Sequence, residues 1–348
     1  MAVSDNRWSV RPEGSNWGDF GPEDQLGRLN LVTADKRREA AAEVREGLAF
    51  CLSLPLDCPS VPLTPVRHPP QIACSGSEDH PVMNFPCGHL FPGMKQVACD
   101  DGVKLSLQYS TQWDALCHMG FLYDATGTGA APKITYYNGY TANDHIRGPY
   151  DYLEDKRLAG PYGAMALGIE RMAETAVQTR GVMVDLMTHV GRGRIPVGYD
   201  RLMRIMDADG VEIEPGDALC LRTGFDRALL AQYADPSIAV NAHDWPGLDG
   251  FDDRLLQWIT DSGLVALVSD NEAVEVWAEF PQVSADGVGI PLHHHCLFKL
   301  GIPLGEMFLL SDLADWLRSH GRSRFLFTAP PLRLPGAVGS PATGVGTV

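Results

Sequence analysis

Short apolar runs recur through the second half of the chain, and segments with the spacing of amphipathic helices separate them. The runs at 182–186, 218–221, 264–268 and 325–328 predict buried strands. Helices are predicted at 199–208, 252–263, 292–300 and 312–319, where Asp252 and Ser311 are candidate N-caps. Because strands alternate with helices, the predicted fold class is α/β.

The first half of the chain has weaker patterns. Thr33 predicts the N-cap of a solvent-facing helix that runs to about residue 46 and ends at Gly47. Nine prolines in 52–93 predict a loop that wraps the surface, 103–115 has strand character, and a helix is expected at about 164–179. We therefore expect an N-terminal extension with a helix, 1–50, followed by one compact catalytic domain, 51–348.

Composition narrows the class of protein. A chain of 348 residues with 45% hydrophobic content can bury a large core. Its net charge of -16 opposes binding to a phosphate backbone, so we expect no nucleic-acid partner. No apolar segment is long enough to cross a bilayer, and the opening residues have no signal-peptide core, so we expect a cytoplasmic protein without membrane contact. Eight cysteines without a C-x-x-C pair indicate reduced thiols.

The segment QYSTQWDALCH contains the most concentrated candidate chemistry. In an extended conformation, alternate side chains point to the same face. One face would then carry Gln108, Ser110, Gln112 and Asp114, and the other Tyr109, Thr111, Trp113 and Ala115. If the polar face is buried, a metal ion or a substrate would satisfy it. An ordinary amphipathic strand with a hydrated polar face is the alternative.

A second cluster is PLHHHCLFKLGIPLGE. Consecutive helical residues point about 100° apart, so at most one of His293, His294 and His295 can face a given ion. Glu306 lies beyond the end of the helix, so spacing alone does not return it to a histidine. Exposed imidazoles at a helix start are the alternative. Asp270 follows a buried strand, where it is either a functional carboxylate or a helix cap.

Other catalytic motifs are missing from the sequence. It has neither the G-x-S-x-G elbow of serine hydrolases nor a P-loop. Its GTGAAP stretch leads into a loop rather than a helix, so it does not predict a dinucleotide site. These absences leave the two polar clusters as the candidate site.

Dispersed motifs, in order along nearly the whole chain, resemble the cyclase family of metal-dependent hydrolases that includes bacterial kynurenine formamidase and isatin hydrolase. The matching segments are EDQLGRLNLVTADKRREAAAEVREGLAFCLSLPL, TQWDALCH, YYNGY, GVMVDL, GDALCLRTGF, VSDNEAVEV, HHHCLFKLGIPLGE, SDLADWL and FLFTAPPLRLPGAVGSPATGVGTV. The resemblance implies a kynurenine formamidase-like (swivelling β/β/α) fold, with a mixed, barrel-like sheet, surrounding helices and an irregular N-terminal extension. It also implies a homo-oligomer, a dimer or tetramer.

The resemblance also implies a metal site. Family members share an H-x-G-T-H-x-D-x-P-x-H segment in which two histidines and the aspartate bind metal and the last histidine is the acid/base. Here Asp114 and His118 remain, while Gln108 and Gln112 replace the two ligand histidines. The downstream ligands correspond to Glu306 and to either His293 or His294. Because family members bind zinc or manganese, the resemblance implies manganese or zinc as the divalent ion, with magnesium possible. Amide oxygens are weaker and harder donors than imidazole, so a site with Gln108 and Gln112 would suit manganese or magnesium better than a tight zinc site.

The function implied is hydrolysis of an amide, lactone or cyclic imide-like bond of a small molecule by metal-activated water, with His118 transferring the proton. Two alternatives stay open: a non-hydrolytic biosynthetic cyclase or lyase, and a catalytically altered binding protein on the same fold. The candidate substrate-binding residues are Trp113, Phe121, Tyr136, Tyr137 and Asp270, although the aromatic ones would equally suit a buried core.

Overall fold

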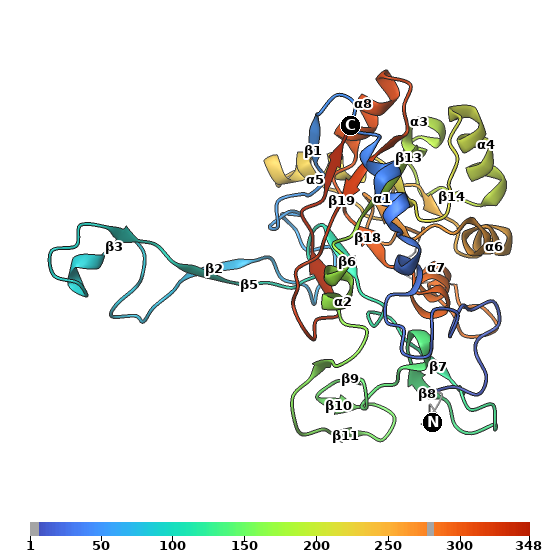
Figure 1. The fold of residues 1–348 in the computed structure, drawn as a ribbon, viewed down its shortest axis with the longest axis horizontal. Helices are drawn as coiled ribbons and strands as arrows, with labels where there is room; N and C mark the ends of the chain where they lie inside the picture. The colour runs from blue at the N-terminus through green and yellow to red at the C-terminus, as the bar shows by residue number, and fades with distance from the viewer. Residues whose placement is uncertain (1–6, 277–281) are drawn as a thin grey trace.

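The computed structural model describes residues 7–276 and 282–348, and a curled nine-stranded sheet forms its centre (Figure 1). Four neighbouring strands run parallel and the outer pairs are antiparallel, so the sheet is mixed. In spatial order the strands are β1 (Ala49–Cys51), β21 (Val345–Thr347), β19 (Arg324–Thr328), β13 (Gln178–Asp185), β15 (Ala218–Arg222), β17 (Ala266–Ser269), β18 (Leu304–Glu306), β6 (Gln112–Asp114) and β20 (Gly339–Pro341).

The apolar runs of the sequence form the middle of this sheet. The four predicted strands correspond to β13, β15, β17 and β19. The first three are buried along nearly their whole length, whereas β19 alternates buried and half-buried residues. Strands covered on both faces read as continuous apolar runs, which explains why the pattern located them.

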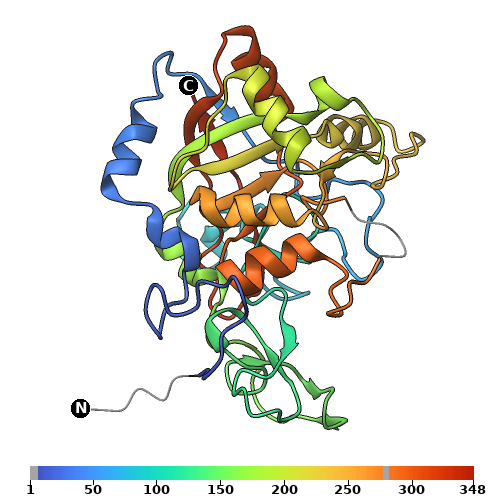
Figure 2. The same ribbon diagram turned by 90° about the vertical axis from the view of Figure 1, so that its right-hand side faces the viewer.

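Helices cover the sheet, with α4 (Tyr199–Asp209), α6 (Asp253–Ser262) and α7 (Pro291–His293) on one face (Figure 2). The α7 helix continues directly into a wider, π-helical segment, η4 (His294–Leu300). The remaining α-helices are α1 (Ala34–Ala41), α2 (Ile169–Glu174), α3 (Leu186–Val190), α5 (Phe225–Ala234) and α8 (Ser311–Ser319). As predicted, Asp252 caps α6, and Gly263 ends it in a left-handed conformation.

Three helix predictions need correction. Thr33 does cap α1 by accepting from the Lys36 amide, but the helix ends at Ala41 rather than near residue 46. The predicted helix at 164–179 shrinks to α2, because Leu167 before it and Ala176 and Val177 after it adopt positive φ values that no α-helix contains. Ser311 is the first residue of α8 rather than its cap, and its hydroxyl donates to Asp226.

Residues 66–105 project from the body as an arm, which contradicts the predicted surface-wrapping loop (Figure 1). Its stem pairs β2 (Gln71–Cys74) with β5 (Asp101–Lys104), and its tip pairs β3 (Phe85–Pro86) with β4 (Val97–Ala98) beside η2 (Cys87–His89). The predicted strand at 103–115 is likewise two strands, because a turn separates β5 from β6.

The N-terminal segment packs on the helix that carries the histidine cluster. The Trp17 indole donates to the Phe298 carbonyl, and the Asn16 amide donates to Leu300, after which η1 (Gly27–Leu31) leads to α1. Short elements complete the fold: β7 (Phe121–Tyr123), β8 (Lys133–Thr135), η3 (Tyr137–Gly139), β9 (Ile146–Arg147), β10 (Tyr150–Asp151), β11 (Lys156–Arg157), β12 (Gly163–Ala164), β14 (Pro196–Val197) and β16 (Gly247–Leu248). No helix in the described ranges is long and apolar enough to cross a membrane.

Candidate metal centre

Two antiparallel strands, β6 and β18, bring the early and late polar clusters together. Their register pairs Glu306 with Gln112 and Leu304 with Asp114. Directly paired residues project to the same face, and side chains alternate along each strand, so Gln112, Asp114 and Glu306 share a face. Trp113 therefore points to the opposite face, where its indole donates to the Ala329 carbonyl in the core.

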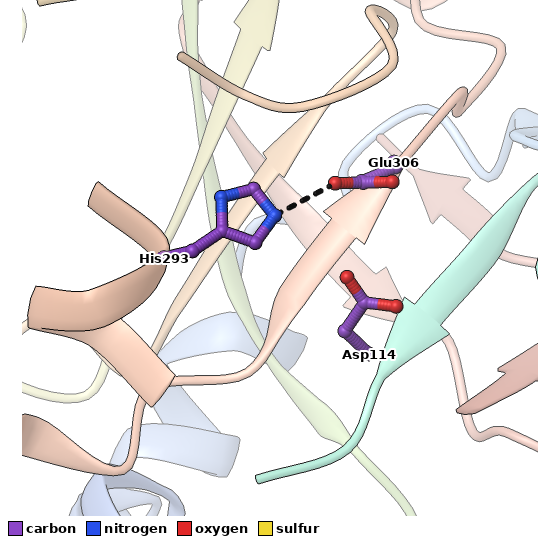
Figure 3. A group of neighbouring side chains, drawn as sticks. All are labelled: Asp114, His293 and Glu306. Carbon is purple, nitrogen blue, oxygen red and sulfur yellow. Dashed lines mark ion pairs between the residues drawn. The ribbon is translucent and has the colours of Figure 1, made fainter. Parts of the chain in front are cut away.

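Asp114, His293 and Glu306 converge in a buried group that could hold a metal ion (Figure 3). One ligand atom from each residue lies within 4.8 Å of the others. His293 approaches from α7 and its Nε2 lies 3.3 Å from Glu306 Oε1. The strands β6 and β18 thus supply two carboxylates and α7 supplies one imidazole, and both kinds of side chain bind divalent cations.

Glu275 fixes the orientation of His293. Its Oε1 lies 2.9 Å from the ring Nδ1 and also accepts the His293 backbone amide, while Oε2 accepts the amide of Leu292. Burial lowers the pKa of His293, but hydrogen bonds to Glu275 and Glu306 outweigh that effect and raise the pKa to about 10. Because Glu275 holds Nδ1, the other ring nitrogen faces the carboxylates of the group.

The group has more negative charge than its single imidazole can balance, and more hydrogen-bond acceptors than its residues have donors. Both Asp114 carboxylate oxygens and Gln112 Oε1 are buried without a hydrogen-bond partner, although Gln112 Nε2 donates to Glu306 Oε2 at 2.7 Å. Burial and the nearby Asp114 carboxylate raise the pKa of Glu306. Unpartnered buried acceptors are costly, and a divalent cation would satisfy them, so these residues fit such an ion.

His118 lies at the edge of this group. It follows β6 in a tight turn in which its amide donates to the Ala115 carbonyl, and its Nδ1 lies 3.7 Å from Asp114 Oδ1. Its side chain is 21% exposed, whereas that of Asp114 is 1% exposed, so His118 is the member closer to solvent. Burial lowers the pKa of His118, and the attraction of Asp114 opposes that shift only partly. A neutral imidazole in this position can accept a proton.

Gln108 also reaches the face that carries Asp114. Gly339 of β20 pairs with Asp114, and a Cβ on Gly339 would clash with the side-chain amide nitrogen of Gln108. The Gln108 amide therefore occupies the space that a side chain at Gly339 would fill, next to Asp114. Gly339 thus gives Gln108 access to the site.

The three consecutive histidines point in different directions, as helix geometry predicted. Only His293 joins the candidate metal group. The His294 ring packs against Phe121 and Phe298, with centroid distances of 4.5 and 4.9 Å, and burial lowers its pKa to about 4. His295 Nε2 lies 2.9 Å from the hydroxyl of Thr260.

The four aromatic residues expected to bind substrate do not gather around the metal group. Tyr137 is buried and hydrogen-bonded to Asp24, Phe121 lies against His294, and Trp113 is in the core, so none of these three meets the metal group. Tyr136 is half-buried beside Gly120, two residues beyond His118.

Asp270 acts as a structural carboxylate at the start of α5. Its Oδ1 accepts from the amide and hydroxyl of Thr223, and its Oδ2 accepts from the amide of Gly224. Both oxygens are therefore used by the loop that precedes α5, and no α5 residue donates to them. No helix begins within residues 271–276, so Asp270 is not the cap of a following helix; it ties the end of β17 to this loop.

Glu275 is the contributor that sequence reasoning did not connect to the histidine cluster. It lies eighteen positions before His293, outside any helical or strand repeat that would pair the two residues. Only a chemical argument could have pointed to such a residue: a buried histidine that binds a metal through one ring nitrogen needs a hydrogen-bond acceptor for the other.

Comparison with known families matches the chain to a group described as "Putative cyclase" over residues 51–276, more than half of its length. None of the curated proteins matches the chain.

Among solved structures, one described as a novel cyclase is 28% identical with a TM-score of 0.72, over 96% of this chain and 99% of that one. Isatin hydrolase A from Labrenzia aggregata, bound to benzyl benzoate, is 14% identical with a TM-score of 0.53, covering 88% and 94%. The enzyme from Ralstonia solanacearum is 16% identical with a TM-score of 0.54, covering 88% and 93%. These likenesses confirm the predicted fold class.

Proposed function

The chain belongs to the cyclase family, and on that premise we propose that it is a metal-dependent hydrolase that opens an amide, lactone or cyclic imide-like bond of a small molecule. The observation that supports this most strongly is the buried Asp114 carboxylate, which has no hydrogen-bond partner and lies beside His293 and Glu306. The shared fold of the isatin hydrolases favours a carbon–nitrogen bond within a ring.

Asp114, His293 and Glu306 would hold the ion, with Gln112 Oε1 as a further oxygen donor. When bound, a divalent cation supplies Lewis-acid chemistry, which lowers the pKa of a water ligand and polarises a carbonyl group. Because oxygen donors outnumber the single imidazole, we propose manganese as the preferred ion over zinc.

His118 would transfer a proton from the attacking water to the leaving atom. In hydrolysis a new carbon–oxygen bond forms, the carbon–nitrogen or carbon–oxygen bond breaks, and one proton moves from water to the leaving atom. A neutral His118 imidazole accepts that proton and returns it to the leaving nitrogen or oxygen. Its position at the solvent side of Asp114 suits this role, because substrate must approach from outside the buried group.

Glu275 and Gln112 would keep the ligands in place. Glu275 holds the His293 ring through Nδ1, and Gln112 holds Glu306 through its amide group. Both residues act on ligands rather than on the substrate, so they are positioning residues.

A turnover screen tests the proposal. Protein supplied with Mn²⁺ is assayed against formanilides, lactones and cyclic imides, beside Asp114→Asn and the surface control Asp209→Asn. We expect ring or amide opening by the wild type and the control, and loss of turnover in Asp114→Asn. Equal turnover by Asp114→Asn and wild type would overturn the proposal.

A further inference from the structure

An open groove with a volume of about 640 Å³ lies between α3, the loop 191–196 and α4. Arg194 lines the groove from the loop, and Arg201 and Arg204 line it from α4. The other described residues that line it are one histidine and four apolar residues, and none is acidic. The groove therefore combines three cationic side chains with apolar walls.

This groove is separate from the candidate metal centre. The α3 helix follows directly from β13, whereas Glu306 ends β18, and β15 and β17 lie between these two strands. Three strand spacings amount to roughly 14 Å. On the helical face, α6 likewise lies between α4 and α7 (Figure 2). A small ligand in the groove would therefore not reach the metal group.

The local sequence places the three arginines together. Gly191 and Gly193 have φ angles of 74° and 144°, which L side chains rarely adopt, so the chain can turn sharply after α3. This turn brings Arg194 to the groove that α4 borders. Arg201 and Arg204 are three positions apart in that helix, so their side chains lie on the same face.

The three guanidinium groups have no partner within residues 7–276 and 282–348. No hydrogen bond or ion pair found there includes them. Carboxylates nearby pair with other arginines, because Asp200 lies 2.9 Å from Arg254 and Asp244 lies 3.7 Å from Arg192. The charge of the groove is thus not neutralised by the described part of the chain.

The groove is basic on an acidic protein. Residues 192–204 contain four arginines and one acidic residue, whereas the whole chain has a net charge of -16. A concave surface lined by charges of one sign concentrates ions of the opposite sign, so the groove attracts anions. An extended polyanion would also lie along the acidic surface beyond the groove and be repelled there, so the fitting ligand is small.

A phosphate group matches these donors better than a carboxylate does. A guanidinium group binds an oxyanion through paired N–H groups, and a single arginine occupies both oxygens of a carboxylate. A phosphate monoester offers three terminal oxygens and roughly two negative charges, which suit three arginines. His189 Nε2 already lies 2.9 Å from Asp209, so the arginines supply the charge. The apolar walls would contact the organic part of the ester.

We propose that this groove is a second ligand site, in which Arg194, Arg201 and Arg204 bind the phosphate group of a small organic monoester. The site does not depend on the proposed hydrolase activity, and its test measures binding rather than turnover.

Isothermal titration calorimetry of the full chain tests the proposal, with phenyl phosphate, inorganic phosphate and benzoate as probes. We expect saturable binding of phenyl phosphate. Inorganic phosphate should bind more weakly because it lacks an apolar group, and benzoate should bind more weakly because it has one charge and two oxygens. The proposal is wrong if phenyl phosphate does not saturate the protein at millimolar concentration, or binds no more tightly than either other probe.

Three variants locate the site. Arg201→Gln/Arg204→Gln should bind phenyl phosphate roughly 100-fold more weakly, about tenfold for each charged donor lost. The control Arg38→Gln/Arg45→Gln removes two charges from exposed arginines elsewhere and should bind as the wild type does. Asp114→Asn should also bind phenyl phosphate normally, because the groove is separate from the metal group.

The same variants can contradict the proposal. Equal losses in the two double variants would mean that overall charge, and not the groove, determines binding. A loss of binding in Asp114→Asn would place the phosphate at the metal group instead. Circular dichroism spectra that match the wild type show that each variant is folded.

Discussion

The His118 imidazole faces Asp114 from the solvent side and is not required to hold the metal group together. We therefore expect His118→Ala to bind the divalent ion as the wild type does, while kcat falls by about 10²- to 10⁴-fold, the usual contribution of a positioned acid/base. Steady-state kinetics and metal analysis of the same sample check this, with exposed His80→Ala as the control. Normal turnover by His118→Ala would show that the residue is structural.

Glu275 accepts three hydrogen bonds, from the His293 ring and from two backbone amides. Glutamine offers only one oxygen, so Glu275→Gln turns an NH₂ group toward at least one of these donors. We expect metal affinity to fall by about 10- to 100-fold, as is typical for partners of ligand histidines. Competitive titration against a chromogenic chelator measures the affinity, and Glu272→Gln is the control. Unchanged affinity would mean that Glu275 does not orient His293.

Some candidate site residues could be predicted from the sequence, and others could not. Asp114, His118 and Glu306 followed from the family resemblance, and helix geometry showed that only one histidine could face the ion. The choice of His293 over His294 needed the rotation of α7 against β18, which no local pattern encodes. Gln108 reaches the site only because Gly339, on a strand more than 200 residues later, leaves room for it.

Asp252 caps two helices at once. Its Oδ1 accepts from Arg254 and Leu255 at the start of α6, and its Oδ2 accepts from the amide of Tyr199 in α4. A single cap is worth about 1 kcal/mol, so we expect Asp252→Ala to lower the free energy of unfolding by about 2 kcal/mol. Urea unfolding followed by circular dichroism measures the loss. Thr33→Ala, which removes the single cap of α1, should cost about half as much; equal losses would contradict the double cap.

Pattern length decided which elements the sequence could predict. The predicted strands β13, β15, β17 and β19 have four to eight residues and clear apolar runs. The strands β1, β18, β20 and β21 have three residues each, too few for a period, and depend on long-range pairing. Proline density correctly indicated that 52–93 lacks long regular elements, but it did not reveal that the segment leaves the body as a ribbon.

The whole protein should become more stable when the ion binds, because the three ligands come from segments that are together only in the folded chain. At a free ion concentration of about 100 times Kd, the expected gain is roughly 2.7 kcal/mol. Thermal unfolding with Mn²⁺ and with EDTA measures it as a rise in Tm of a few degrees. Asp114→Asn should show no such rise, and an equal rise in that variant would place the ion elsewhere.

The alternation of strands and helices established an α/β class from the residues alone. The mixed order of the sheet did not follow from that pattern, because β6 and β20 join it from segments more than 200 positions apart. The family resemblance supplied the barrel-like arrangement, and the likeness to solved cyclase structures confirms it. Loop closure over such distances depends on tertiary packing, which a single sequence does not display.

The most direct test of the central claim is an anomalous difference map from a crystal of the full chain soaked in Mn²⁺. The account predicts one strong peak within about 2.5 Å of a carboxylate oxygen of Asp114, a carboxylate oxygen of Glu306 and Nε2 of His293. A map without a peak in this group, or with its strongest peak at other residues, would contradict the account.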